Sequence, residues 1–259
     1  MEAMFKSPRL QITVEWVRRF GLLKYLGHAS LGILKISRLD KPAVYQKLMK
    51  TASRIEVNPF AIAEIDNYKV RSRLERECTE LRDLIQRRLS RGKFPANWNS
   101  GVETAVLLYL LVRKNEISKV LEIGTGNGIS TLALYLALKN NTKEMILKTV
   151  DISKSAGSVL NKEERSAIEF EVVEPDLRSK KLLFSQLESF NPDMVFVDGA
   201  HDYLSVINDL ELSLALNPKF LIADDIEVND AWQDFCLENK MTYRVFLDGR
   251  KVLGICKLS

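Results

Sequence analysis

The 259-residue chain has few of the residues that mark special structural classes. It contains 3 cysteines, 7 prolines and 12 glycines. Cys78, Cys236 and Cys256 are odd in number, lie far apart in the sequence and form no Cys-x-x-Cys pair, so neither a disulfide framework nor a cysteine metal site is indicated. A reducing, cytoplasmic location is therefore expected. With 46% hydrophobic residues, the composition also excludes collagen-like and disordered chains.

Long apolar runs are missing as well. No stretch reaches the ~18 uncharged apolar residues that a membrane-spanning helix requires. The first ten residues lack the continuous apolar segment of a signal peptide. No transmembrane segment is expected, and the length suits one large domain or a core with an appendage.

The formal net charge of +4 hides an uneven distribution. Residues 1–100 hold 20 Lys and Arg against 10 Asp and Glu, whereas residues 101–259 hold 18 against 24. The pattern is helical up to about residue 92, and Gly92-Lys93-Phe94-Pro95 interrupts it. We therefore expect a helical N-terminal lid or oligomerisation segment over residues 1–95 and a second domain over residues 96–259.

The basic segment could serve three purposes. It could form a lid or homodimer surface, contact RNA, or lie on a membrane surface. Aromatic side chains are scarce beside its arginines, with only Tyr68 and Phe94 flanking the run from Lys69 to Lys93. This scarcity favours the lid or dimer surface over a nucleic-acid footprint.

After residue 115, short β-rich runs alternate with helical runs. The expected strands are Lys119–Ile123, Ile146–Asp151, Phe170–Glu174, Met194–Asp198 and Phe220–Ala223, followed by a hairpin of Thr242–Leu247 and Val252–Lys257 around Asp248-Gly249-Arg250. The expected helices are Glu103–Arg113, Ser130–Lys139, Ser155–Glu164, Ser179–Glu188, Tyr203–Ala215 and Ala231–Lys240. This alternation predicts an α/β fold with an open, doubly wound parallel sheet.

A glycine-rich turn follows the first of these strands and precedes a helix. Gly124, Gly126 and Gly128 would let a ligand approach the backbone at the carboxyl end of the sheet. The dinucleotide fingerprint requires a glycine where Ile129 stands, and no Gly-Lys-Ser/Thr follows to make a phosphate loop.

Glu122-x-Gly124-x-Gly126-x-Gly128 at the end of a first strand resembles the first motif of class I S-adenosylmethionine-dependent methyltransferases. The resemblance covers residues from about 97 to 259. It implies a Rossmann-like sheet of order 3-2-1-4-5-7-6, with strand 7 antiparallel, and S-adenosylmethionine as cofactor. The cofactor-binding residues that it implies are Glu122, Gly124, Thr125, Gly126, Asn127, Gly128, Asp151, Ile152, Asp176 and Asp198.

Within that resemblance, Asp151 would accept hydrogen bonds from both ribose hydroxyls, and Asp176 would face the adenine amino group. Glu122 would lie near the amino-acid end of the cofactor. Each residue also has a purely structural alternative, because glycines often only form a tight turn and either aspartate could cap a helix.

Acidic residues end two further strands. Asp198-Gly199-Ala200-His201 follows the fourth strand, and Asp224-Asp225 follows the fifth. Because these strands are neighbours in the predicted sheet, the three carboxylates should converge. Their mutual repulsion would raise a pKa, so we expect either a cation or a buried proton among them. Oxygen ligands of this kind suit Mg²⁺.

Asp-Gly-x-His-x-Tyr, with paired aspartates after the next strand, is similar to a branch of the same family that includes metal-dependent sugar and small-molecule O-methyltransferases. This resemblance implies Asp198, Asp224 and Asp225 as metal ligands. It also implies His201 and Asp198 as catalytic residues, with His201 the general base for a substrate hydroxyl. Related domains keep Asp-Gly-x-His without a metal, so Mg²⁺ dependence stays open.

The expected function is thus O-methylation of a small-molecule hydroxyl. Methylation of RNA through the basic segment and a non-catalytic cofactor-binding role are the alternatives. Residues 97–103, Trp98 among them, are expected to line the mouth of the site.

Overall fold

The computed structural model describes residues 47–48, 50–95, 99–141, 144–249 and 251–258. About half of the expected N-terminal segment, residues 1–46 and 49, therefore lies outside the described residues, as does Trp98.

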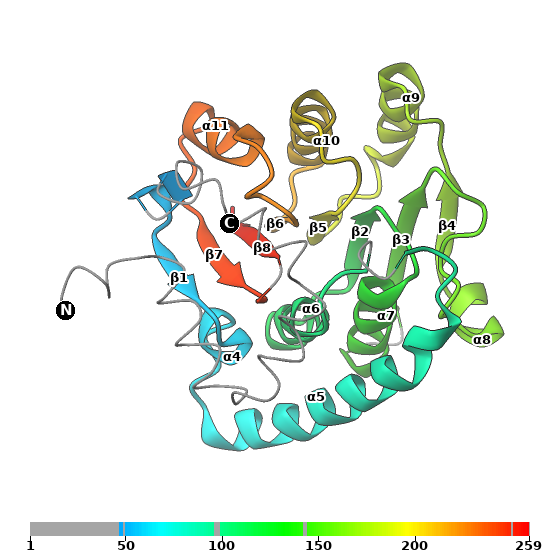
Figure 1. Cartoon of the computed structure of the whole chain (residues 1–259), viewed down its shortest axis with the longest axis vertical. Helices are drawn as coiled ribbons and strands as arrows, with labels where there is room; N and C mark the ends of the chain where they lie inside the picture. The colour runs from blue at the N-terminus through cyan, green and yellow to red at the C-terminus, as the bar shows by residue number, and fades with distance from the viewer. Residues whose placement is uncertain (1–46, 49, 96–98, 142–143, 250, 259) are drawn as a thin grey trace.

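One sheet of eight strands forms the centre of the molecule (Figure 1). Its strands are β1 (Arg54–Glu56), β2 (Lys119–Ile123), β3 (Ile146–Asp151), β4 (Glu169–Val172), β5 (Met194–Val197), β6 (Phe220–Ala223), β7 (Arg244–Leu247) and β8 (Val252–Lys257). They lie in the order β1-β7-β8-β6-β5-β2-β3-β4. From β4 to β7 this is the expected order 3-2-1-4-5-7-6, and β8 is antiparallel to both of its neighbours. The predicted Rossmann-like fold class is confirmed.

Strand β1 was not expected from the sequence, which predicted helix throughout this region. It pairs parallel with β7, with Ile55 opposite Val245, and extends the sheet at its edge (Figure 1). Three residues are too few for the alternation of apolar and polar side chains to be recognised, so the pairing partner decides the structure here.

The helices form layers on both faces of the sheet. They are α4 (Pro59–Ile62), α5 (Tyr68–Arg88), the 3₁₀ helix η2 (Leu89–Arg91), α6 (Val102–Lys114), α7 (Ile129–Asn141), α8 (Lys162–Ser166), α9 (Leu177–Leu187), α10 (Tyr203–Ala215) and α11 (Ala231–Glu238). Figure 1 shows α9, α10 and α11 on one face and α6 and α7 on the other, with α5 outside them. None of these helices has both the length and the apolar character needed to cross a bilayer.

Helix α8 is much shorter than the expected Ser155–Glu164. Gly157 has a φ of 77°, which ends any helix there, and its N–H donates to the carbonyl of Gly126 over 2.9 Å. The helix begins only after Asn161, whose side chain caps it by accepting from the N–H of Glu164. The preceding segment instead packs against the glycine-rich turn.

Helix α5 packs against α6 through one apolar stripe. Leu74, Cys78, Leu81 and Ile85 recur at helical spacing and are buried in the same core cluster as α6. This cluster spans the boundary expected near residue 95, since it holds side chains from both sides of it.

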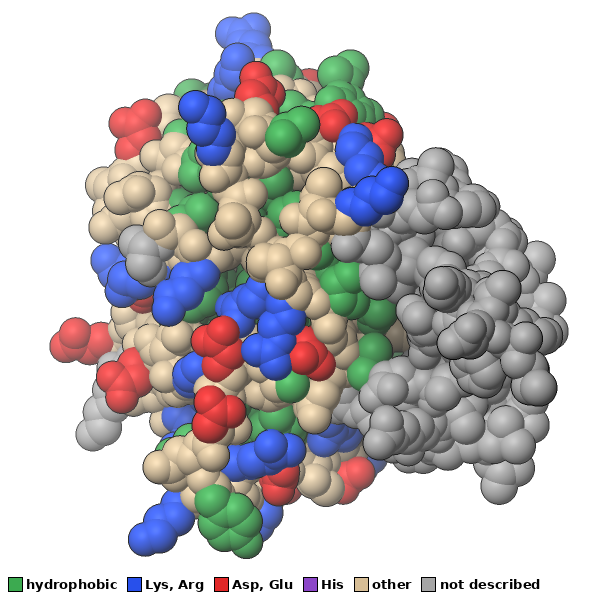
Figure 2. All heavy atoms as spheres, turned by 90° about the vertical axis from the view of Figure 1, so that its left-hand side faces the viewer, with side chains coloured by type: hydrophobic (Ala, Val, Ile, Leu, Met, Phe, Trp, Pro, Cys, Tyr) green, Lys and Arg blue, Asp and Glu red, His purple; other side chains and the backbone are tan. Residues whose placement is uncertain are grey.

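Part of the positive charge of α5 is compensated within the chain. Arg82 pairs with Glu103 over 2.7 Å, and Arg88 pairs with Glu164 over 2.5 Å. On the face shown in Figure 2, Lys and Arg side chains lie interspersed with Asp and Glu over the described surface. The sequence-level charge imbalance therefore does not produce a surface of one sign on this face.

The three cysteines are buried and free. Cys236 and Cys256, which are distant in sequence, meet in the core, where their Sγ atoms are 3.8 Å apart between α11 and β8. Sequence separation gave no indication of this contact.

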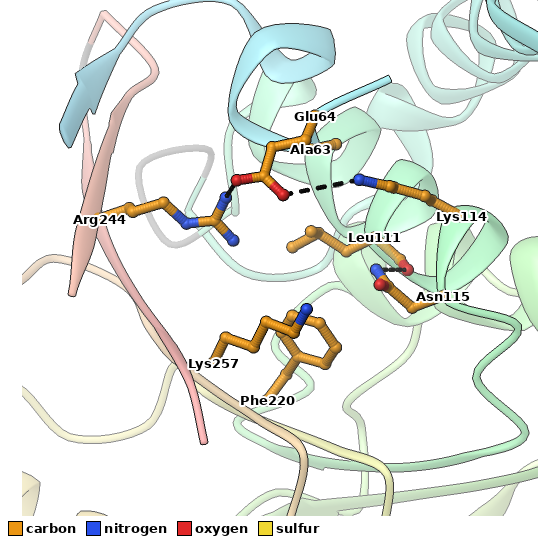
Figure 3. A pocket seen from close by; sticks show the side chains of 8 residues that line it. All are labelled: Ala63, Glu64, Leu111, Lys114, Asn115, Phe220, Arg244 and Lys257. Atoms are coloured by element: carbon orange, nitrogen blue, oxygen red, sulfur yellow. Dashed lines mark hydrogen bonds and ion pairs between the residues drawn. The ribbon is translucent and has the colours of Figure 1, made fainter. Parts of the chain in front are cut away.

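A cavity of about 10 Å³ lies where β6 and β7 begin, at the amino-terminal edge of the sheet. Figure 3 shows the side chains of Lys114 and Arg244 directed toward Glu64, with which both form ion pairs. The space suits about one water molecule and no substrate. The functional site must be sought at the opposite edge.

Candidate active site

The glycine-rich turn lies in contact with the end of β5. Gly124, Gly126 and Gly128 have φ angles of 96°, 51° and 93°, which side chains rarely allow. A Cβ on Gly124 would lie 2.0 Å from the carbonyl oxygen of Asp198. The glycines therefore let the turn and the acidic strand end form one continuous site.

Asp151 holds the turn in place. Its Oδ2 accepts hydrogen bonds from the N–H groups of Thr125 and Gly126 over 3.0 and 2.9 Å, and its Oδ1 accepts from the N–H of Ser153 over 2.8 Å. Oδ2 thus uses both of its lone pairs, whereas Oδ1 can accept one further bond, so a ribose contact at Oδ1 is compatible with this arrangement. The next side chain, Ile152, is 68% exposed and offers an apolar surface beside that carboxylate.

Asn127 has a structural role that its assignment to the cofactor did not anticipate. Its buried amide oxygen accepts from the N–H of Phe94 and the hydroxyl of Ser158, over 2.9 and 3.0 Å. Its nitrogen donates to Asn99 Oδ1 and to the carbonyl of Phe94, over 2.5 and 3.1 Å. Three of these four bonds tie the segment before α6 to the glycine-rich turn, and the fourth ties Ser158 to it.

Asp176 caps helix α9. Its carboxylate accepts from the N–H and the hydroxyl of Ser179, over 3.0 and 2.6 Å, and these bonds hold the pKa of this exposed carboxyl below its usual value. The capping alternative is thus realised in this structure, and a contact with adenine stays a prediction.

Glu122 is fully buried beneath the turn. Its Oε2 accepts from the hydroxyls of Thr131 and Thr149, over 2.6 and 2.7 Å. Its Oε1 has no hydrogen-bond partner among the described residues. Burial raises the pKa of this carboxyl to about 7.

This shifted pKa predicts a pH-dependent stability. The native state retains the Glu122 proton up to about pH 7, whereas an unfolded glutamate has its ordinary pKa of 4.5 and releases the proton near that pH. The free energy of unfolding should therefore fall by about 3 kcal/mol as the pH rises across that window. Urea unfolding of the wild type and of Glu122→Gln at several pH values measures the effect. Parallel pH profiles for the two proteins would contradict it.

The three aspartates expected to converge do so, around a lysine. Lys251 Nζ contacts Asp224 Oδ2, lies 3.3 Å from Asp225 Oδ2 and lies 3.7 Å from Asp198 Oδ1. The lysine side chain is only 2% exposed. Of the two alternatives, a cation or a buried proton, the structure has a cation, and it is an ammonium group of the chain itself.

The surrounding carboxylates keep Lys251 charged. Burial raises the pKa of Asp198 to about 6 and that of Asp224 further, and the Lys251 ammonium opposes both shifts. Burial by itself lowers the pKa of Lys251, but the three carboxylates outweigh it and leave that pKa well above its usual value. Lys251 is therefore protonated throughout the physiological range.

The sequence contains a signal for Lys251 that we did not use. The residue directly follows the Asp248-Gly249-Arg250 turn and begins the last strand, which lies antiparallel beside β6. The start of such a strand lies at the same sheet edge as the carboxyl end of its neighbour. A lysine at the start of the last strand is therefore expected to lie close to Asp224 and Asp225.

His201 lies at the outer side of the cluster. Its Nε2 is 3.4 Å from Asp225 Oδ2, and its side chain is 41% exposed. Asn229 donates to the backbone carbonyl of His201 over 2.8 Å and so holds this loop. Ser100, from the segment before α6, donates to Asp198 Oδ2 over 2.9 Å. The two predicted catalytic residues, His201 and Asp198, therefore both lie at this acidic cluster.

A fourth carboxylate was missed. Glu227 is buried two residues after Asp225, and neither of its carboxylate oxygens has a hydrogen-bond partner among the described residues. Burial, followed by the charge of Asp225, raises its pKa to about 8. Within the described part of the chain, no group of three or more His, Cys, Asp and Glu side chains is arranged to hold a metal ion.

Residues 121–223 match a family model described as a methyltransferase domain. This part of the chain is therefore similar to methyltransferase domains. The match begins in β2 and ends with β6, so it includes the glycine-rich turn, Asp151 and Asp198. It stops one residue before Asp224, and Lys251 lies outside it.

Solved structures share the fold of this methyltransferase domain. An O-methyltransferase from Bacillus cereus, in complex with SAH, is 16% identical and has a TM-score of 0.53, over 70% of this chain and 91% of that one. Cofactor-bound Rv0187 from MTB is 14% identical with a TM-score of 0.51, over 71% and 88%. No curated protein matches the chain.

Proposed function

We propose that the methyltransferase domain binds S-adenosylmethionine at the glycine-rich turn and methylates a hydroxyl group of a small molecule. The observation that carries the proposal is the joint arrangement of this turn, Asp151 and His201 at one edge of the sheet. The Bacillus cereus protein with a similar fold is an O-methyltransferase in complex with SAH, which supports the same chemistry here.

The residues present fit the cofactor. The positive φ angles of the three glycines give a turn without side chains at these positions, and Glu122 Oε1 is a buried acceptor without a partner among the described residues. Asp151 would hold the ribose, and exposed Ile152 would lie against the adenine. The cofactor, when bound, supplies an electrophilic methyl group on a sulfonium sulfur.

His201 would accept the proton of the substrate hydroxyl. Its exposed imidazole can be reached by a substrate, and the carboxylate of Asp225 at 3.4 Å orients the ring and favours the imidazolium that forms. Asp198, fixed by Ser100, borders the turn and helps to place the reacting groups. Mg²⁺ has no part in this proposal, because Lys251 stands among its expected ligands.

We also propose a cytoplasmic location, which the thiols support. Cys78, Cys236 and Cys256 are free, although two of them lie in contact. This state fits a reducing compartment, so we place the enzyme in the cytoplasm.

His201→Ala should reduce methyl transfer by about 100-fold or more, since positioned general bases contribute at least that much. The assay incubates the purified protein with methyl-labelled S-adenosylmethionine and separated small-molecule and RNA fractions of a cell extract. Calorimetric titration with S-adenosylhomocysteine should give the same affinity, within about twofold, for the variant and the wild type.

Tyr203→Phe is the matched control, because it changes a neighbouring exposed side chain whose hydroxyl only contacts Asp234. It should transfer methyl groups like the wild type. Label in the RNA fraction alone would overturn the substrate class. Absence of S-adenosylhomocysteine binding by the wild type would overturn the proposal as a whole.

A further inference from the structure

We propose that Lys251 is a built-in cation that takes the place of a divalent metal ion among Asp198, Asp224 and Asp225, so that this site excludes Mg²⁺ and Mn²⁺. The proposal rests on the geometry of the acidic cluster and is independent of cofactor binding.

The lysine occupies the position that a metal would need. Its Nζ approaches one oxygen of each of the three aspartates, which come from the ends of β5 and β6. A Mg²⁺ ion bound by the same oxygens would lie about 2.1 Å from each of them. Because an ammonium group and a metal ion cannot both lie at the meeting point of these oxygens, binding of one requires removal of the other.

The hairpin that carries Lys251 is held rigidly. The carbonyl of Lys251 accepts from the N–H of Asp248 over 2.9 Å. The Asp248 carboxylate in turn accepts from the N–H and the hydroxyl of Thr104 at the start of α6, both over 2.8 Å. The next residue, Val252, accepts from the N–H of Ile226 over 3.0 Å. These bonds anchor the hairpin on both sides of the acidic cluster.

Displacement of the lysine would be costly. Its side chain is 2% exposed and its ammonium group lies among the carboxylates of Asp198, Asp224 and Asp225. A protonated amine left buried without its partners loses far more than an exposed ion pair would. A metal ion would have to compensate for this loss in addition to its own dehydration.

Lys251 also acts on the general base through Asp225. Its Nζ and His201 Nε2 approach the same atom, Asp225 Oδ2, over 3.3 and 3.4 Å. The lysine is therefore a positioning residue, since it holds the carboxylate that orients His201. A fixed ammonium replaces the metal as the organising charge, without providing a coordination position for the substrate.

The test compares the full-length wild type with Lys251→Met, whose side chain is unbranched, one atom shorter and uncharged. Thermal unfolding and calorimetric titration are performed with Mn²⁺ and Mg²⁺, after treatment with EDTA. For the wild type we expect no change in Tm beyond about 1 °C in millimolar metal and no saturable binding. The variant should bind one Mn²⁺, with an affinity at least about tenfold above any that the wild type shows. Its Tm should rise by about 3 °C in the presence of the metal.

Two further variants complete the design. Lys69→Met removes an exposed lysine of α5 and should behave like the wild type. Lys251→Arg keeps a cation and should still exclude the metal. Saturable binding of one Mn²⁺ to the wild type that is lost in Asp225→Asn would overturn the proposal, even if Lys251→Met does not fold. Failure of S-adenosylhomocysteine to bind would leave this result unaffected.

Discussion

Replacing Gly124 with alanine is expected to destabilise the protein by about 3 kcal/mol and to abolish binding of S-adenosylhomocysteine. The residue has a φ of 96°, which costs an alanine about 1 kcal/mol or more. The added methyl group would also lie 2.0 Å from the carbonyl oxygen and 2.5 Å from the carbonyl carbon of Asp198. Such a contact with backbone can be relieved only by moving β5 or the turn, which costs a further 1–3 kcal/mol or so.

Gly199→Ala is the matched control for this prediction. Gly199 follows Asp198 at the same edge, but its nearest heavy atoms would be 3.5 Å from the new methyl group, and its φ is not in the left-handed region. Its free energy of unfolding should change by less than about 1 kcal/mol. Urea unfolding of the three proteins measures the difference. Equal destabilisation by both substitutions would show that the close approach at Gly124 is not the cause.

Asp151→Ala is expected to weaken S-adenosylhomocysteine binding by about 100-fold or more. The substitution leaves the N–H groups of Thr125, Gly126 and Ser153 without their acceptor, so the turn loses its fixed geometry. The proposed ribose contact is lost at the same time. Calorimetric titration gives the affinity, and urea unfolding should show a parallel loss of about 2 kcal/mol.

Asp176→Ala separates this effect from a general loss of charge near the cofactor. Asp176 only caps α9 in this structure, so its removal should cost about 1 kcal/mol of stability and change the affinity little. A loss of affinity as large as that of Asp151→Ala would instead assign Asp176 to the adenine. If Asp151→Ala binds S-adenosylhomocysteine like the wild type, the cofactor site lies elsewhere.

Local features of the chain were predictable because they depend on neighbours in sequence. The bounds of β2, β3, β6, β8 and α10 follow from apolar periodicity and turn residues, and the structure has them as expected. The sheet order follows from the resemblance and is confirmed. Helix α8 shows where prediction from sequence neighbours fails. Its expected first half is not helical, because the N–H of Gly157 donates to the carbonyl of Gly126 in the glycine-rich turn.

The site shows the same division. Asp151, Asp198, Asp224, Asp225 and His201 follow strand ends, and parallel strands bring their carboxyl ends to one edge, so their convergence could be expected from the sequence. Asn127 and Asp176 were assigned to the cofactor by position in the motif. Their side chains are instead engaged with the segment before α6 and with the start of α9.

By itself the sequence determined the α/β sheet, the glycine-rich turn and the expectation of either a cation or a buried proton among three aspartates. Only the tertiary structure decided that Lys251 supplies the cation, that β1 extends the sheet, and that Glu122 and Glu227 are buried with oxygens that have no partner among the described residues. The physical reason is that turns and periodicity act over a few residues. Charge pairing and burial depend on which distant segments the fold brings into contact.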